Sequence, residues 1–203
     1  MRRAFVFFSA LALLAGPASL PAQGIAVAGT PIGGGTPGVS APTVVIIVRH
    51  ADKAAQPAND PPLTEVGAAR AQALAAALAE AKVAAVYSTA TTRTRETARP
   101  IAERAGVSVQ PIAGQGMAGM TAAVVEAVKA NPGKTVVIVG HSNTVMPWIA
   151  ALGGPKRPDL CDHHYDGLYT LVLDGVTARL IEGHYGPPNP PETAPCATSQ
   201  MRP

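Results

Sequence analysis

The sequence predicts an α/β fold of three layers, α/β/α, with helices on both faces of a mostly parallel sheet. Three observations predict it. Residues 44–48 and 136–139 consist only of Val and Ile, which is typical of strands buried on both faces. Short apolar runs alternate with Ala-rich helical segments, and this β-α-β order indicates parallel strands. Asp174-Gly175 lies between two late apolar runs and predicts a β-hairpin.

The strands follow from short apolar runs, most of them rich in β-branched residues. In chain order they are predicted over 43–48, 83–87, 107–109, 135–139, 169–173 and 177–182. The helices occupy the segments between the strands. They are predicted over 64–82, from about residue 93 to about residue 105, over 121–130 and over 144–152. Thr64 is the N-cap of the first helix, and Glu65 lies in its first turn, where the helix dipole favours an acid. Gly106 ends the second helix.

The N-terminus has the features of a secretory signal peptide, assigned to residues 1–22. Arg2 and Arg3 form its positive end, and the apolar stretch 4–15 is too short to span a bilayer. Ala22 is the candidate cleavage position. An uncleaved membrane anchor is the alternative, and we favour cleavage because no long apolar run follows. We therefore expect a periplasmic or secreted protein without stable membrane insertion.

Three further segments complete the expected organisation. Residues 23–42 are rich in Gly, Pro, Ala and Thr and are interpreted as a flexible linker. The domain is expected over 43–185, followed by a Pro-rich C-terminal tail over 186–203. Cys161 and Cys196 are the two cysteines, and in an exported protein such a pair often forms a disulfide. Two free thiols are the alternative.

Composition and charge exclude some classes of function. Aromatic residues make up 4% of the chain, which leaves little surface for stacking on bases. The 16 Lys and Arg residues exceed the 13 Asp and Glu residues by three, and without Arg2 and Arg3 the balance is 14 against 13. The positive charge therefore belongs largely to the signal, and we expect no nucleic-acid partner.

Arginine and histidine side chains, which are or can become positively charged, follow three of the predicted strands. Arg49 and His50 follow the first strand, Arg93 follows the second, and His141 follows the strand over 135–139. The carboxyl ends of parallel strands form one rim of the sheet, where open α/β folds bind ligands. Helix N-termini beside them add free backbone N–H groups. Such a rim suits a dianion, since Arg forks match phosphate geometry and His can attack phosphorus.

Four segments carry a resemblance to a known family. They are VRHADK at 48–53, PLTEVG at 62–67, YSTATTRTRETA at 87–98 and GHSN at 140–143. In order and spacing the chain resembles the histidine phosphatase superfamily, in its phosphoglycerate mutase-like branch, over roughly 44–173. The resemblance implies the corresponding α/β fold.

The resemblance also implies a role for each matching residue. His50 is expected to be the nucleophile that takes the phosphoryl group, and Arg49 and Arg93 to hold the phosphate oxygens. His141 is expected to stabilise the transferring group. Ser142 and Asn143 are the further candidate phosphate-binding residues. Such a site works by positioning and charge stabilisation, and it requires no metal or other cofactor.

The sequence departs from the family pattern at the proton donor. The stretch 110–120, where many members carry a Glu, contains no Asp or Glu, and Ser142 stands where another branch has an Asp. Asp52 is the candidate acid, and its alternative role is to order Arg49 or Lys53. Without a carboxylic acid, phosphohistidine, acyl phosphates and aryl phosphates should be favoured, because their leaving groups need less protonation.

The sequence offers two other candidate sites. Residues 159–166 offer carboxylates, imidazoles and a thiol that could hold a metal, and the alternative is a polar loop that shapes substrate access. Ser142 invites a serine hydrolase interpretation, but the Gly-x-Ser-x-Gly elbow is missing. The favoured prediction is an exported, metal-independent hydrolase of phosphomonoesters, phosphohistidine or acyl phosphates, with a phosphorylated small molecule or phosphoprotein as substrate. A phosphate-binding protein without turnover and a phosphomutase are the alternatives.

Overall fold

A computed structural model describes residues 41–191 and 196 of the chain. The expected signal peptide over 1–22 lies outside the described residues, as do all but the last two residues of the expected linker over 23–42. Most of the Pro-rich tail lies outside them as well. None of the helices in the described part is both long and apolar enough to cross a membrane.

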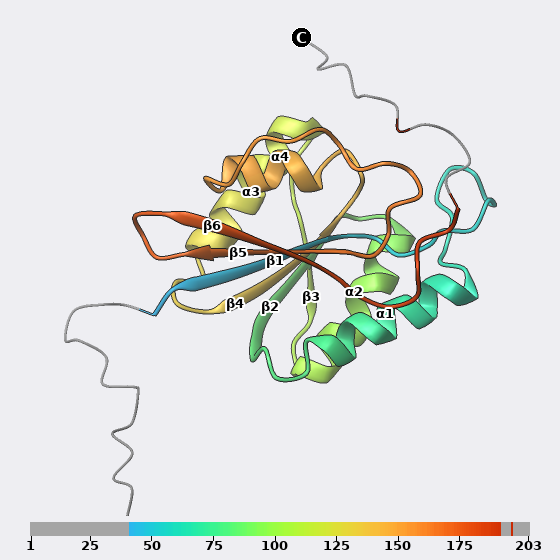
Figure 1. The fold of residues 1–203 in the computed structure, drawn as a ribbon, viewed down its shortest axis with the longest axis horizontal. Coiled ribbons are helices and arrows are strands. Elements are labelled where there is room, and N and C mark those ends of the chain that lie inside the picture. The colour runs from blue at the N-terminus through green and yellow to red at the C-terminus, as the bar shows by residue number, and fades with distance from the viewer. Residues whose placement is uncertain (1–40, 192–195, 197–203) are drawn as a thin grey trace, which may run out of the picture. The chain divides into compact units, whose positions relative to one another are not determined.

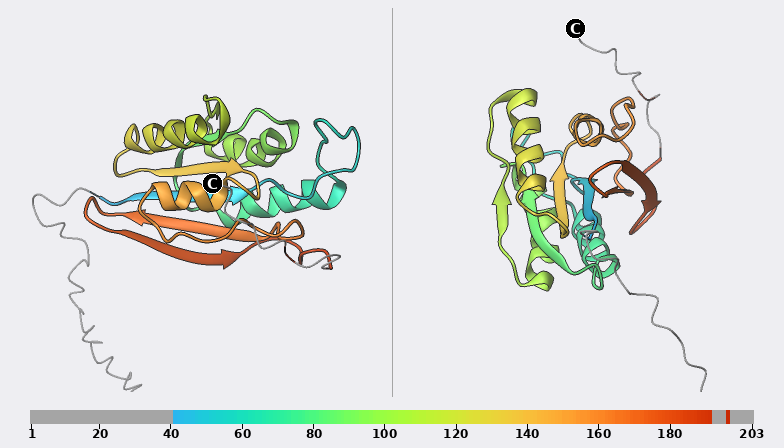
Figure 2. Two further views of the ribbon diagram at one scale, coloured as in Figure 1. Left: turned by 90° about the horizontal axis from the view of Figure 1, so that it is seen from above. Right: turned by 90° about the vertical axis from the view of Figure 1, so that its left-hand side faces the viewer.

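Six strands form a single sheet within the described residues, in the order β3-β2-β4-β1-β5-β6. Their bounds are β1 Thr43–Arg49, β2 Val83–Ser88, β3 Val109–Pro111, β4 Thr135–Gly140, β5 Gly167–Leu173 and β6 Ala178–His184. β1, β4, β2 and β3 pair in parallel, whereas β5 runs antiparallel to β1, and β6 runs antiparallel to β5. The mostly parallel sheet and the late hairpin predicted from the sequence are both confirmed (Figures 1 and 2).

Helices cover both faces of the sheet and complete the three layers. The described chain contains α1 Glu65–Ala77, α2 Thr92–Ala105, α3 Gly116–Lys129 and α4 Val145–Ala151. Figure 1 shows α1 and α2 together on one side of the sheet and α3 and α4 on the other. Alternate residues of the strands therefore enter two different cores. Val45 and Ile47 pack on the side of Trp148, while Ile46 and Val48 pack on the side of Leu74.

Several element boundaries differ from the sequence prediction, and three of these differences have local reasons. The third strand begins at Val109 rather than 107, because the backbone N–H of Val107 is bonded to the carbonyl of Ala102 at the end of α2. Helix α3 begins at Gly116, five residues before the expected start, in a Gly- and Met-containing segment without a capping signal. Helix α1 ends at Ala77, and tighter turns follow up to Lys82, which has a positive φ of 49°.

The domain also extends past its expected end at residue 185. The guanidinium of Arg70 donates hydrogen bonds to the carbonyl oxygens of Tyr185, Pro187 and Pro188. The side chain of Asn189 accepts hydrogen bonds from the backbone N–H groups of Tyr165 and the residue after it. The first residues after 185 therefore contact the domain through Arg70 and Asn189, which composition did not reveal because it showed the prolines but not the buried arginine that binds their carbonyls.

Candidate active site

The two histidines that end strands lie side by side. β1 and β4 are neighbours in parallel, with Arg49 opposite Gly140, and the backbone N–H of His50 donates to the carbonyl of Gly140 at 2.9 Å. Because both strands end at the same edge, His50 and His141 leave the sheet together. Their ring centroids are 5.4 Å apart.

His50 is a neutral imidazole, and one of its two ring nitrogens is hydrogen-bonded to the backbone. Its Nδ1 is 2.8 Å from the carbonyl oxygen of Ala51, which can only accept, so Nδ1 carries the proton. The side chain is buried, and this burial, with the nearby charge of Arg49, lowers the pKa of His50 to about 3. Nε2 is therefore the nitrogen with a lone pair, which is the requirement for a nucleophile near neutral pH.

His141 is neutral as well, and both of its nitrogens have partners. Nε2 lies 2.8 Å from the hydroxyl oxygen of Thr89, and Nδ1 lies 3.5 Å from Nη2 of Arg93. Burial and then the charges of Arg93 and Arg49 lower the pKa of His141 to about 4. A dianion between these cations would counter the two charge effects and raise that pKa again.

Arg93 stands in the first turn of α2, with Asp60 beside it. Nη1 of Arg93 is 3.7 Å from the Asp60 carboxylate, which also accepts hydrogen bonds from the backbone N–H and the hydroxyl of Thr92. Those hydrogen bonds lower the pKa of Asp60, so this carboxylate stays ionised. Asp60 thus helps to place Arg93, a role that its position before two prolines did not reveal.

Arg49 is buried and binds the loop that follows α4. Its Nη1 donates to the carbonyl oxygens of Cys161, Asp162 and His164, at 2.8, 2.9 and 3.1 Å. Nη2 lies 3.6 Å from the Asp162 carboxylate, and the guanidinium stacks on the ring of Tyr165 at 4.3 Å. One edge of Arg49 therefore organises this loop rather than facing a ligand.

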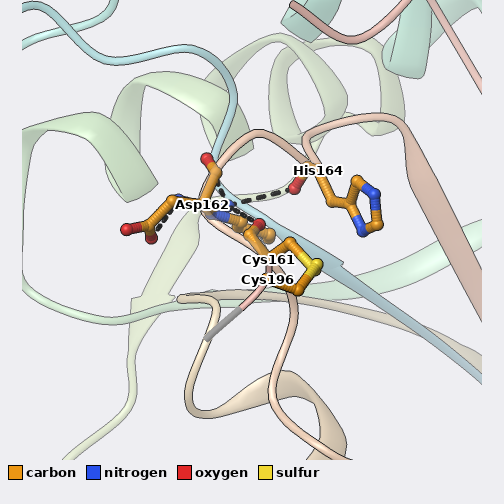
Figure 3. The surroundings of a disulfide bond; sticks show 5 residues. Cys161, Asp162, His164 and Cys196 are labelled. Carbon is orange, nitrogen blue, oxygen red and sulfur yellow. Dashed lines mark hydrogen bonds and ion pairs between the residues drawn. A yellow bond between two sulfur atoms is a disulfide. The ribbon is translucent and has the colours of Figure 1, made fainter. Parts of the chain in front are cut away.

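The loop is also tied to the tail by a disulfide. The structure joins Cys161 and Cys196, and Figure 3 shows the bond beside Asp162 and His164. The ring of Tyr165, farther along the same loop, lies 6.0 Å from the ring of His50. The segment expected to shape substrate access thus contacts both Arg49 and the candidate nucleophile.

Two unpartnered N–H groups mark where an anion would bind. Nε of Arg49 and Nε of Arg93 are buried without a hydrogen-bond partner, and they are two of the four such side-chain atoms in the described chain. A buried donor without a partner is unfavourable, and in native proteins it calls for a water, an ion or a ligand. Both donors belong to arginines that flank the two histidines.

The structure places the candidate acid Asp52 away from this role. Its carboxylate is 2.7 Å from Nε and 3.5 Å from Nη2 of Arg70, a side chain of α1 with no exposed surface. The geometry therefore favours a structural ion pair. The partner is Arg70, and not Arg49 or Lys53, because α1 approaches the backbone after His50 closely. A Cβ at Gly67 would collide with the carbonyl of Asp52.

Ser142 and Asn143, the two remaining candidate phosphate-binding residues, form no hydrogen bond with the other site residues in the described structure. Asn143 is exposed and Ser142 is half-buried, and no hydrogen bond in the described structure joins either side chain to His50, His141, Arg49 or Arg93. Three backbone carbonyls of the loop over 159–166 accept hydrogen bonds from Arg49. No group of three or more His, Cys, Asp or Glu side chains in residues 41–191 and 196 is arranged to hold a metal ion.

A family model now adds to this geometry. The model for the histidine phosphatase superfamily (branch 1) matches residues 45–114, which include Arg49, His50 and Arg93. This match supports the assignment of the chain to the histidine phosphatase superfamily. The resemblance to this superfamily and the mixed α/β fold, both predicted from the sequence, are confirmed. No curated protein matches the chain.

Solved structures of histidine phosphatases and their relatives share the fold. The protein histidine phosphatase SixA, complexed with tungstate, is 20% identical with a TM-score of 0.54, over 70% of this chain and 96% of its own. A mycobacterial glucosyl-3-phosphoglycerate phosphatase, complexed with VO3, is 19% identical with a TM-score of 0.52, over 68% and 96%. Phosphoglycerate mutase from Bacillus anthracis is 15% identical with a TM-score of 0.51, over 71% and 94%. At these identities the likeness establishes the fold.

Proposed function

We propose that this protein is an exported, metal-independent phosphatase that forms a phosphohistidine intermediate on His50. One observation carries the proposal. A buried, neutral His50 with a free Nε2 lies beside His141 and two arginines whose Nε donors have no partner. This arrangement combines a nucleophile with fixed positive charge for a phosphate dianion, which is what phosphoryl transfer requires.

The reaction would run in two displacements. Nε2 of His50 attacks phosphorus and the new N–P bond forms. The bond from phosphorus to the leaving oxygen, or to the leaving nitrogen of a phosphohistidine substrate, breaks, and the leaving group keeps its electron pair. The hydrogen bond from Nδ1 to the Ala51 carbonyl stabilises the positive charge that develops on the ring. Water then attacks phosphorus, the N–P bond breaks, inorganic phosphate leaves, and Nε2 regains its lone pair.

The substrate class follows from the available acids. Asp52 is paired with Arg70, and Asp60 is held ionised by Thr92, so neither carboxyl is suited to protonate a leaving group. We therefore propose substrates with good leaving groups, namely phosphohistidine, acyl phosphates and aryl phosphomonoesters. A phosphorylated small molecule or a phosphoprotein would supply them.

The test uses the purified protein with a chromogenic aryl phosphate. We expect turnover, inhibition by vanadate or tungstate, no effect of a chelator, and an acid-labile phosphoenzyme in a rapid quench. His50→Ala should abolish both turnover and the phosphoenzyme. His184→Ala is the control, because that histidine is 80% exposed and lies on β6. Full activity in His50→Ala would overturn the proposal.

The missing acid also motivates a second candidate, a phosphate-binding protein without turnover. It predicts that phosphate binds with an affinity that falls in Arg93→Ala, while no phosphoenzyme forms with any ester. A third candidate, a phosphomutase, is supported by the fold likeness to phosphoglycerate mutase alone. It would require transfer of the phosphoryl group between positions of a sugar phosphate, which product analysis would detect.

A further inference from the structure

Two buried threonines, Thr89 and Thr94, form a chain of hydrogen bonds that ends on the ring of His141. We propose that Thr89 and Thr94 act as positioning residues that hold His141 with its proton on Nε2, so that the Nδ1 lone pair faces Arg93 and the phosphate bound there. The inference rests on the proposed function for its consequence, but the tautomer itself is a property of the free protein.

The argument begins at the inner end of a hydrogen-bonded chain. The hydroxyl of Thr94 lies 2.8 Å from the carbonyl oxygen of Thr89 and 2.9 Å from that of Thr91. Of the four oxygens around the Thr94 hydroxyl, the two carbonyls can only accept, so we assign its single proton to one of them. Thr94 has no exposed surface, so no water competes for this proton.

That orientation fixes the next hydroxyl. The oxygens of Thr89 and Thr94 are 3.0 Å apart, and since Thr94 has used its proton, Thr89 must be the donor between them. The hydroxyl of Thr91, 2.9 Å from that of Thr94, is likewise a donor to it. Thr94 thereby accepts two hydrogen bonds and donates one, which is the full capacity of a hydroxyl.

His141 is the outer end of the chain. Thr89 has given its proton to Thr94, so toward Nε2, 2.8 Å away, it can only accept, and Nε2 must carry the ring proton. Nδ1 is then an acceptor, in agreement with the N–H donor of Arg93 at 3.5 Å. The opposite tautomer would set Nδ1–H against the Arg93 N–H and leave two hydroxyl oxygens facing each other without a proton.

The consequence concerns the place of the proton in the loaded site. When a phosphate dianion binds between Arg93 and His141, the proton that the ring takes up can only go to Nδ1, on the phosphate side. The imidazolium then donates toward the transferring group while its other N–H stays anchored on Thr89. In the opposite tautomer Nδ1 would already carry a proton toward the phosphate, and the proton added on Nε2 would force the Thr89 hydroxyl to turn from donor to acceptor.

The experiment reads the tautomer by ¹⁵N NMR of histidine-labelled protein, with the His141 signals assigned by their loss in His141→Gln. We expect wild-type His141 to carry its proton on Nε2. Thr94→Val should shift the population toward Nδ1–H, although residue 94 does not touch the ring, because Thr89 is then free to donate to Nε2. Thr94→Ser should restore the wild-type spectrum. In Thr94→Val kcat should fall, but by less than the about 100-fold or more that loss of a general acid–base residue costs.

Ser88→Ala is the matched control. Ser88 is also buried at the end of β2 and donates to the carbonyl of Thr89, but it does not belong to the chain. It should leave the His141 spectrum and kcat unchanged. Wild-type His141 with its proton on Nδ1, or an unchanged tautomer in both Thr89→Val and Thr94→Val, would overturn the inference. A wild-type protein with the expected tautomer but no phosphatase activity would refute only the proposed function.

Discussion

Asp52→Asn separates a structural carboxylate from a catalytic one. The side chain is 14% exposed and lies 2.7 Å from Nε of the fully buried Arg70. The amide would leave the Arg70 charge without its counter-ion and set an NH2 group against guanidinium N–H groups. Removing one partner of a buried pair costs about 3–5 kcal/mol of unfolding free energy. Three carbonyl acceptors remain on Arg70, so we expect the lower end, about 3 kcal/mol.

Urea denaturation followed by circular dichroism measures this loss, and kinetics on an aryl phosphate are measured in parallel at a temperature where the variant is folded. A loss of this size corresponds to a fall in melting temperature of roughly 6–12 °C for a chain of this length. We expect kcat to change by less than about threefold, since the carboxylate is committed to α1. A general acid would instead contribute about 100-fold or more.

Glu103→Gln is the control for removal of an ion-pair carboxylate. Glu103 pairs with Arg99 at 3.9 Å, with both side chains more than two-thirds exposed, and the change should alter stability by less than about 0.5 kcal/mol. If Asp52→Asn keeps the wild-type urea midpoint but loses activity by two orders of magnitude, the structural interpretation is wrong and Asp52 is the acid.

Two further predictions concern pH and the disulfide. The pKa values of His50 and His141 are lowered to about 3 and about 4, so the unfolded chain binds more protons below pH 6.5. The contribution of these two neutral histidines to the free energy of unfolding is complete above that pH and is lost as pH falls. For His50 alone the loss is about 3 kcal/mol at pH 4. Urea midpoints of His50→Gln should therefore depend less on pH than those of the wild type. Cys161→Ala should cost about 3–4 kcal/mol, because the bridge spans 35 residues, and should abolish the effect of a reductant on the wild-type midpoint. A wild-type midpoint that a reductant leaves unchanged would contradict the latter prediction.

Much of the fold could be predicted from local patterns. The Val and Ile runs of β1 and β4, the capping threonine of α1 and the Asp174-Gly175 hairpin each have a short-range physical cause. The prediction was least accurate where the local signal was weak or where the cause was not local. Helix α3 starts among glycines, and the chain past residue 185 is held by an arginine more than 100 residues earlier.

The site divides in the same way. The expectation of parallel strands and the positions of their ends predicted that His50, His141, Arg49 and Arg93 would gather at one edge, since parallel strands finish together. The partners of these side chains were not predictable, because they come from segments without a pattern. Asp60, Tyr165 and the carbonyls of the loop after α4 are such partners.

The sequence by itself determined which residues stand at the rim of the sheet, because the period of a strand and the position of its last residue are local properties. Only the tertiary structure decided what each of them does there. In the folded protein Asp52 forms an ion pair with Arg70, Arg49 donates hydrogen bonds to the disulfide-bonded loop, and His141 is hydrogen-bonded to Thr89. The physical reason is that a hydrogen bond depends on where two side chains meet in space, and packing of distant segments fixes that meeting point.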